Sequence, residues 1–174
     1  DIIIADGSVP TLALKKATST IPIVMANSSD PVGTGLVASF ARPGGNVTGL
    51  TNIGVEIGGK VLDLLKEVVP RLNRVAILTT ASAVTDAFLK EAEAPARALK
   101  LQLIPVVVQG PDDFEGAFRA MTKEKVNGLV IRLQPSLYSA HFKRLAELSI
   151  KYRLPSIAQY STWTDVGGLM SYGA

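Results

Sequence analysis

The sequence predicts an α/β protein in which mostly parallel sheets are covered by helices on both faces. Short, mostly apolar runs occur at residues 2–5, 21–26, 75–78, 101–108 and 128–133. The run at residues 2–5 is continuously apolar, which is typical of parallel strands buried on both faces. Amphipathic stretches separate these runs, so that strand and helix alternate along the chain. The 174 residues are 47% hydrophobic, which is enough for a substantial core.

The first fifty residues predict three short strands separated by two helices. Pro10 is tolerated in the first turn of a helix, and Pro22 fits only the first positions of a strand or an edge. A Pro-Gly-Gly turn after Arg42 ends the second helix. The expected order is strand 2–5, helix 10–17, strand 21–26, helix 32–40 and strand 47–50.

The rest of the chain repeats the alternation with longer elements. Ile57, Val61 and Leu64 lie on one face of a helix that Pro70 ends. Pro95 is expected to kink or shorten a later helix. The strands are expected at residues 75–78, 101–108, 128–133, 156–158 and 169–171, the helices before residue 70, at 86–99, from 110 and from 136 to 152, and a loop at 160–166.

Composition excludes several classes of protein. The formal net charge is only +3, because 18 basic residues are scattered among 15 acidic ones, whereas a nucleic-acid interface needs a basic patch or stripe. We therefore expect no nucleic-acid partner. No apolar run approaches the roughly 20 residues of a membrane span. The chain has no Cys, which removes disulfides, thiol catalysis and Cys-type metal sites.

Two features resemble parts of known functional sites but lack the other residues that those sites need. Gly33-Thr34-Gly35 begins a formal match to the dinucleotide fingerprint GxGxxA, yet no acidic residue ends the next strand to hold a ribose. His141 is the only histidine and has no convergent partners for a triad or a zinc site. We therefore expect no catalytic residues, no metal and no cofactor.

Polar turns follow the expected strands at the edge where ligands bind in parallel sheets. These turns are rich in hydroxyl, amide and glycine groups, which suits a ligand cradle. Asp30 precedes Pro31, where it either caps a helix or accepts from a ligand ammonium. Trp163 either stacks on a ligand or covers the core. The turns comprise residues 6–8, 27–30, 79–85, 134–136 and 160–164.

Several blocks carry a family resemblance. They are residues 29–32, the string ARPGGNVTG at 41–49, LDLLKE at 62–67 and GGLMSYG at 167–173. With these blocks the chain resembles the ABC-transporter substrate-binding protein family that includes the tryptophan/tyrosine-type binding proteins. The resemblance implies the type I periplasmic-binding-protein fold, with two flavodoxin-like α/β lobes joined by a hinge and the ligand between them.

The resemblance also implies a division of the chain. Residues 1–50 correspond to the C-terminal part of the first lobe, 51–166 to the second lobe, and 167–174 to a crossover back toward the first lobe. We therefore expect a fragment of the two-lobe protein. Strand edges exposed in such a fragment predict a homodimer or strand exchange.

Strand-end chemistry and the resemblance together give the expected ligand-binding residues. Two positions depart from the family pattern. Thr80-Ala81 replaces a polar pair, and Gln134 stands where many members have an Asp that suits a ligand ammonium. The expected ligand-binding residues are Gly7, Ser8, Ser28, Asp30, Asn46, Thr48, Thr80, Ser82, Thr85, Gln134, Ser136 and Trp163.

The predicted function is the extracytoplasmic solute-binding component of an ABC importer. It would bind a small polar or aromatic, amino-acid-like solute in an interlobe cleft without chemistry, and its closed form would meet an ABC permease in the membrane. The predicted location is periplasmic or extracellular and membrane-associated. One alternative is the ligand-sensing domain of a transcriptional regulator, since such domains share the fold. Another is an α/β enzyme that uses Asp6, Asp30 or Asp165.

Overall fold

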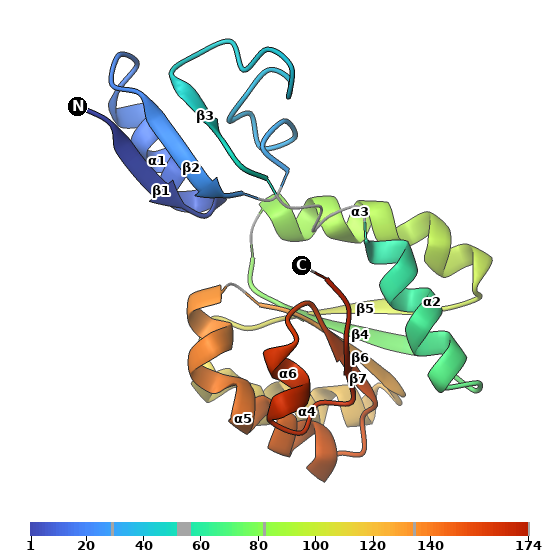
Figure 1. Cartoon of the computed structure of the whole chain (residues 1–174). Helices are drawn as coiled ribbons and strands as arrows, with labels where there is room; N and C mark the ends of the chain where they lie inside the picture. Colours follow the sequence, from blue (N-terminus) through green and yellow to red (C-terminus); the bar gives the residue numbers. More distant parts are fainter. Residues whose placement is uncertain (29, 52–56, 82, 134, 174) are drawn as a thin grey trace. The chain divides into compact units, whose positions relative to one another are not determined.

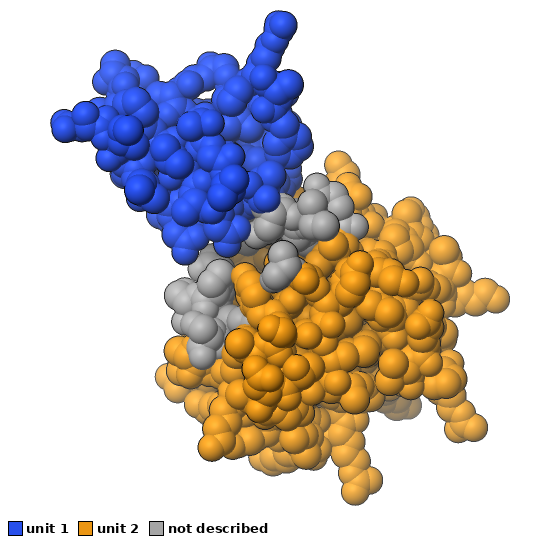
Figure 2. Space-filling model, in the orientation of Figure 1, with its two compact units in different colours: residues 1–55 blue, residues 56–174 orange. Residues whose placement is uncertain are grey.

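The computed structural model describes residues 1–28, 30–51, 57–81, 83–133 and 135–173. The chain divides into two compact units, unit 1 at residues 1–55 and unit 2 at residues 56–174 (Figure 2). Both units are α/β, and every strand pair in their sheets is parallel, as predicted. In the described part of the chain, no helix is long and apolar enough to cross a bilayer.

Unit 1 is a three-stranded sheet with the order β1-β2-β3 and one helix against one of its faces (Figure 1). The face toward the helix carries a small core that includes Ile23, Met25 and Val47. On the opposite face Ile4 is 75% exposed. The elements are β1 (Ile3–Asp6), α1 (Ser8–Ala17), β2 (Ile23–Asn27) and β3 (Val47–Gly49).

The prediction of a helix over residues 32–40 is wrong, because the chain forms successive turns there. Asp30 has a φ of 50° and Gly35 a φ of 71°, and left-handed residues interrupt a right-handed helix. The Asp30 carboxylate accepts a hydrogen bond from the Gly33 N–H at 2.8 Å. Lys15 Nζ donates to the Gly35 carbonyl at 2.6 Å. These contacts hold the turns while Leu36 still reaches the core.

Unit 2 is a five-stranded sheet with the order β5-β4-β6-β7-β8. Numbered by their place in unit 2, the strands lie in the order 2-1-3-4-5, which is flavodoxin-like as predicted. Pro105 is accommodated because β5 is an edge strand. The elements are α2 (Gly58–Val68), β4 (Arg74–Thr79), α3 (Ala83–Ala98), β5 (Gln102–Val107), η1 (Pro111–Asp113), α4 (Phe114–Lys123), β6 (Gly128–Arg132), α5 (Pro135–Lys151), β7 (Ser156–Ala158), α6 (Thr162–Asp165) and β8 (Met170–Ser171).

Helices cover both faces of this sheet, and each face has its own core (Figure 1). On one face α2 and α3 contribute Leu62, Leu65 and Phe88, which are almost completely buried. On the other face α4 and α5 contribute Phe118 and Leu145. Alternate residues of the central strands point into the two cores, as the continuously apolar strands predict.

The expected loop over residues 160–166 contains a four-residue helix, α6. Trp163 on this helix is completely buried and packs against Phe142, with ring centroids 5.9 Å apart. A Cβ on Gly168 would lie 2.1 Å from the indole Nε1. The chain therefore closes tightly over the indole, and the structure places Trp163 in the core.

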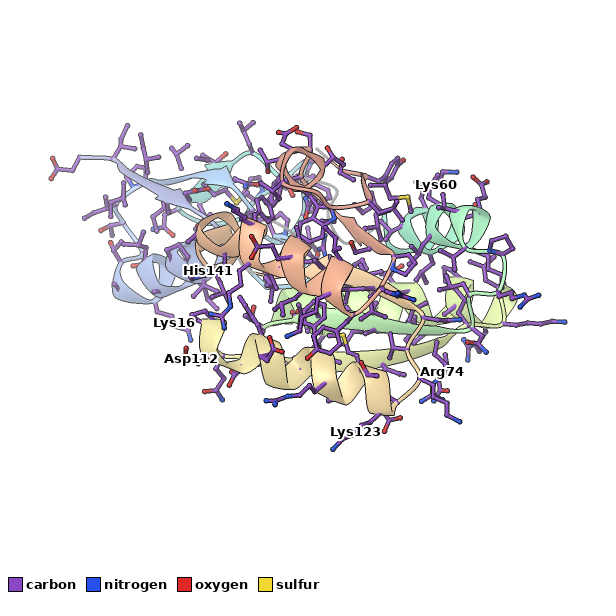
Figure 3. The ribbon with its side chains drawn as sticks, turned by 90° about the horizontal axis from the view of Figure 1, so that it is seen from below. Lys16, Lys60, Arg74, Asp112, Lys123 and His141 are labelled. Carbon is purple, nitrogen blue, oxygen red and sulfur yellow. The ribbon has the colours of Figure 1, made fainter. Side chains whose placement is uncertain are left out.

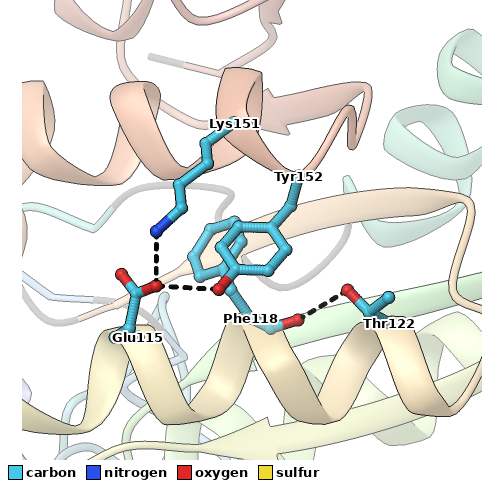
Figure 4. A network of polar contacts seen from close by, with 5 residues as sticks. All are labelled: Glu115, Phe118, Thr122, Lys151 and Tyr152. Carbon is cyan, nitrogen blue, oxygen red and sulfur yellow. Dashed lines mark hydrogen bonds and ion pairs between the residues drawn. The ribbon is translucent and has the colours of Figure 1, made fainter.

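A polar network joins α4 to α5 on the outer side of this core (Figure 4). One Glu115 oxygen accepts hydrogen bonds from Lys151 Nζ at 2.6 Å and from the Tyr152 hydroxyl at 2.8 Å. The Tyr152 ring packs on Phe118, with centroids 5.7 Å apart. The Lys151 hydrogen bond, and then that of Tyr152, hold the pKa of Glu115 below its ordinary value of 4.5. The Glu115 hydrogen bond raises the pKa of Lys151 above 10.5.

This network predicts a pH-dependent stabilisation of unit 2. A carboxyl whose pKa is lowered by folding stabilises the fold above its ordinary pKa and loses that contribution as the pH falls. An amine whose pKa is raised stabilises below its ordinary pKa and loses the contribution as the pH rises. We expect Glu115→Gln to lower the melting temperature at pH 7, and the deficit to shrink below about pH 4.5 and above about pH 10.5.

Thermal melts of the wild type and of Glu115→Gln from pH 3 to pH 11 measure the difference in melting temperature. Glu93→Gln on the exposed surface of α3 is the matched control and should leave the melting temperature unchanged at every pH. A deficit for Glu115→Gln that is constant across the whole range would contradict the role given to the charge of Glu115.

Candidate ligand-binding site

The carboxyl ends of β4 and β6 form the topological switch point of unit 2. The strand after β4 along the chain, β5, lies on one side of it, and β6 lies on the other side. Ligands of open parallel sheets bind outside the carboxyl ends of the strands at such a point. Thr79 ends β4 and is paired in register with Arg132, which ends β6. The candidate site is therefore the edge formed by these strand ends.

Arg132 is a charged residue at this edge, and two of its contacts are with neutral side chains. Its Nη1 donates a hydrogen bond to the Gln159 side-chain oxygen at 2.7 Å, and Gln159 directly follows β7. Its guanidinium carbon lies 4.5 Å from the ring centroid of Phe88 on α3. These contacts with an amide and an aromatic ring help to orient the guanidinium. The arrangement presents a positioned positive group to a ligand.

The two threonine hydroxyl groups next to Arg132 lie close together, and each donates to a backbone carbonyl. Thr79 Oγ1 lies 2.8 Å from Thr85 Oγ1 and donates to the Arg132 carbonyl at 3.0 Å. Thr85 Oγ1 donates to the Thr80 carbonyl at 2.7 Å. These bonds tie the end of β4 to the first turn of α3 and to β6. The threonines therefore fix the strand ends that carry Arg132.

The expected site residues of unit 2 are distributed unevenly around this edge. Thr80 is half-buried immediately after β4, and Thr85 is buried. Ser82 and Gln134 lie outside the described residues, and Ser136 is placed only as part of the α5 backbone. Trp163 lies in the core, so its indole is not at the edge.

In unit 1 the carboxyl ends of β1 and β2 bring three of the expected residues together. The Ser8 and Ser28 hydroxyls are 2.9 Å apart, and Ser28 is 1% exposed. Gly7 has a φ of 91°, a value that favours glycine, and its N–H donates to the Asn27 carbonyl at 2.8 Å. The turn after β1 is thus fastened to the end of β2.

Three other expected residues of unit 1 are placed elsewhere. The Asp30 carboxylate accepts from the Gly33 N–H within successive turns, where the structure has no helix for it to cap. Asn46 precedes β3, at the amino edge of the sheet. Its Nδ2 donates to the Thr18 and Ile21 carbonyls at 3.0 and 2.8 Å. Thr48 is exposed within β3. These residues are not gathered with Ser8 and Ser28 at the carboxyl edge.

Charged side chains of both signs lie on different elements. Lys16, Lys60, Asp112 and Lys123 are exposed on α1, α2, η1 and α4, and Figure 3 shows them pointing away from the ribbon. His141 on α5 is half-buried with its ring edge-on to Phe114. Among the residues that the structure describes, no three His, Asp or Glu residues are grouped as metal ligands.

The family model described as ABC transporter substrate binding protein matches residues 1–174. The chain belongs to this family. The match confirms the family that the ARPGGNVTG and GGLMSYG strings indicated in the sequence.

The chain is similar to proteins of other bacteria, and two of the three that follow are described with an amino acid. The tyrosine-binding protein of Clostridioides difficile is 35% identical over 87 residues, which are 49% of this chain and 24% of that protein. The structure of a Streptococcus pneumoniae ABC domain in complex with L-Trp has a TM-score of 0.87 at 23% identity, with 98% of this chain and 57% of that chain covered. A conserved domain protein from Vibrio cholerae has a TM-score of 0.85 at 22% identity, with 97% and 56% covered.

The chain spans about a quarter of the length of the curated relative and a little over half of those two solved chains. The two structural likenesses establish the fold, and the predicted type I periplasmic-binding-protein architecture agrees with them. The assignment of residues 1–50, 51–166 and 167–174 to parts of a larger two-lobe protein stays a prediction.

Two residues at the edge of this substrate-binding chain were absent from the sequence prediction. Arg132 and Gln159 are the last residue of β6 and the first residue after β7. The sequence prediction considered only the polar turns that follow the strands. It placed Arg132 inside the strand expected at residues 128–133, so Arg132 was not a candidate. A signal was present, because Gly-Leu-Val-Ile-Arg is a buried strand with a charged residue only at its carboxyl end.

Proposed function

We propose that this chain is the part of an ABC importer's binding protein that captures a small polar or aromatic solute without altering it. The observation that carries the proposal is a flavodoxin-like sheet in a chain of the substrate-binding family, with a positioned guanidinium at its switch point. Binding requires only fixed donors and acceptors at the strand ends, which Arg132 and Gln159 supply. The solute leaves chemically unchanged, so the chain acts as a carrier and not as an enzyme.

The proposal extends to the partners and location that importers of this class require. The solute-loaded protein is released to an ABC permease in the membrane, and the protein works in the periplasm or outside the cell. Relatives that carry tyrosine or tryptophan in their names or structures support an amino-acid-like or aromatic solute. Assembly of two copies through sheet edges stays a prediction, which the mass measured by light scattering tests.

A thermal-shift screen of the full-length protein tests the proposed function. The compounds are the amino acids, small aromatic carboxylates such as benzoate, and purines, each at millimolar concentration. A solute present at 100 times its Kd stabilises the folded state by about 2.7 kcal/mol, and above the Kd the melting temperature rises with the logarithm of the solute concentration. The proposal predicts a small set of specific stabilisers, each recovered unchanged after incubation. A screen without any stabiliser contradicts it.

A further inference from the structure

We infer that the amino edge of the unit 2 sheet is a docking surface for a lipid bilayer that contains anionic phospholipids. This surface, which we call the basic edge, comprises the last turns of α2, α3, α4 and α5, the connections from these helices to the strands that follow them, and Arg74 at the start of β4. The inference rests on the proposed function in one respect, because a protein that delivers a solute to a permease works beside a membrane.

Basic residues that are dispersed along the sequence gather at the basic edge. Each of the four helices has one basic residue in its last turn, and Arg74 opens β4 (Figure 3). Each helix-to-strand connection carries one more, namely Arg71, Lys100, Lys125 and Arg153. The basic edge thus contains nine basic and two acidic residues, whereas the rest of residues 56–174 contains six basic and ten acidic ones. Unit 2 is therefore strongly positive at this edge alone.

Three of the connections place a cation where the backbone favours glycine. Lys100, Lys125 and Arg153 have φ values of 56°, 53° and 53°, in the left-handed region that glycine usually occupies after a helix. In each case the N–H of the next residue donates to the carbonyl five residues before it, at 2.8, 3.0 and 2.9 Å, and closes the helix end. A cation also interacts favourably with the helix dipole, but each helix already has one in its last turn. Neither the backbone nor the dipole therefore accounts for a cation in all three connections.

Most of the positive charge of the basic edge is available to an external partner. Arg74 pairs with Glu124, Lys151 pairs with Glu115, and Lys66 donates to a backbone carbonyl. The other six basic residues are exposed, and none of them forms an ion pair with a residue that the structure describes. They are Arg71, Arg97, Lys100, Lys123, Lys125 and Arg153.

A bilayer suits this arrangement better than a protein partner with matching acidic side chains. The six cations come from the ends of four different helices, and no ion pair fixes the position of their charged groups. Attraction to an anionic membrane requires positive charge near the surface and no fixed pairing geometry. Val68 in the last turn of α2 and Ile150 in the last turn of α5 are 54% and 64% exposed, and apolar side chains beside cations favour the headgroup region.

Vesicle co-sedimentation of the wild-type, full-length protein, purified without detergent, tests the inference. The vesicles contain phosphatidylcholine alone or with about 30% phosphatidylglycerol, in about 0.1 M and about 1 M NaCl, where the Debye lengths are about 10 and 3 Å. We expect binding to the phosphatidylglycerol vesicles at about 0.1 M NaCl and binding at least about 10-fold weaker at about 1 M. Phosphatidylcholine vesicles should not bind.

A triple variant locates the contact without damaging the fold. Lys100→Gly, Lys125→Gly and Arg153→Gly together remove three charges at positions whose backbone favours glycine, so the melting temperature should equal or exceed that of wild type. Affinity for the phosphatidylglycerol vesicles should fall about 100-fold, because each cation near an anionic surface contributes a factor of about five.

The matched control removes the same charge outside the basic edge. Lys90→Gln, Lys143→Gln and Arg144→Gln together alter exposed positions before the last turns of α3 and α5. This control should bind the phosphatidylglycerol vesicles within about 3-fold of wild type, because salt screens charges that lie more than a Debye length from the membrane. Equal losses in the two triple variants would show that only the net charge matters, which overturns the inference.

Two further results would overturn the inference. One is equal binding of both kinds of vesicle, or binding that does not change with salt. The other is binding of poly-L-glutamate or of a short DNA duplex by a protein that ignores the vesicles, which would assign the basic edge to a partner of another class.

The thermal-shift screen separates the inference from the proposed function. The triple glycine variant should keep every stabilising solute of wild type, because the basic edge is at the opposite edge of the sheet from the candidate site. If solutes stabilise the protein but vesicles do not bind, the inference is overturned and the proposed function stands. A screen without any stabiliser overturns the proposed function, whereas the vesicle result still supports or overturns the inference by itself.

Discussion

Replacing Trp163 by alanine is expected to lower the free energy of unfolding of unit 2 by about 3–5 kcal/mol. The indole is completely buried, it packs on Phe142 at 5.9 Å, and the backbone at Gly168 closes over its Nε1. Alanine leaves a cavity that this tightly fixed surround cannot fill by collapse. Urea unfolding followed by far-UV circular dichroism measures the loss as a shift of the midpoint.

A matched truncation distinguishes this cavity effect from a general sensitivity of unit 2. Ile150 on α5 is 64% exposed, so Ile150→Ala should change the free energy of unfolding by no more than about 0.5 kcal/mol. Similar midpoints for Trp163→Ala and Ile150→Ala would show that Trp163 is not the core residue described here.

Replacing Gly49 by alanine is expected to destabilise unit 1 by on the order of 3 kcal/mol. Gly49 has a φ of 139°, and a Cβ on this residue would lie 2.1 Å from the Met25 carbonyl oxygen. The same oxygen accepts the hydrogen bond from the Leu50 N–H at 2.8 Å. The added methyl group therefore collides with the backbone that joins β2 to β3, where no side-chain rotation relieves it.

Amide hydrogen exchange reports this effect locally. In Gly49→Ala we expect faster exchange at the Leu50 and Ile23 amides. The Ile23 N–H donates a hydrogen bond to the carbonyl of Asn46, just before β3. Gly45→Ala is the control, because nothing lies within 4 Å of a Cβ built on Gly45. Unchanged exchange in Gly49→Ala, or equal acceleration in both variants, would contradict the close approach of β3 to β2.

Much of the fold follows from local patterns in the sequence. Residues 128–131 are apolar and form most of the central strand β6, and the amphipathic stretch before Pro70 forms α2. The prediction of a helix over residues 32–40 failed because it treated Gly33 and Gly35 as small helical residues. The sequence does not reveal that Asp30 binds the Gly33 N–H and that Lys15 binds the Gly35 carbonyl.

The site was less predictable, because it depends on contacts between residues distant in sequence. Asn46 was assigned to the ligand edge by resemblance, yet its amide binds the connection between α1 and β2 at the opposite edge. Arg132 gains its significance from Phe88 and Gln159, 44 and 27 residues away along the chain. Only the order of the strands in the sheet brings these three side chains together.

The most direct test of solute binding at the strand ends is to locate the binding site by nuclear magnetic resonance. Backbone amide shifts are recorded during titration of the full-length protein with the tightest compound from the thermal-shift screen. The account predicts that the largest shifts within unit 2 fall at Thr80, Leu133 and Gln159, beyond the carboxyl ends of β4, β6 and β7, and that the compound is recovered unchanged. Shifts confined to the amino edge, at Asn73 and Asn127, or conversion of the compound, would contradict it.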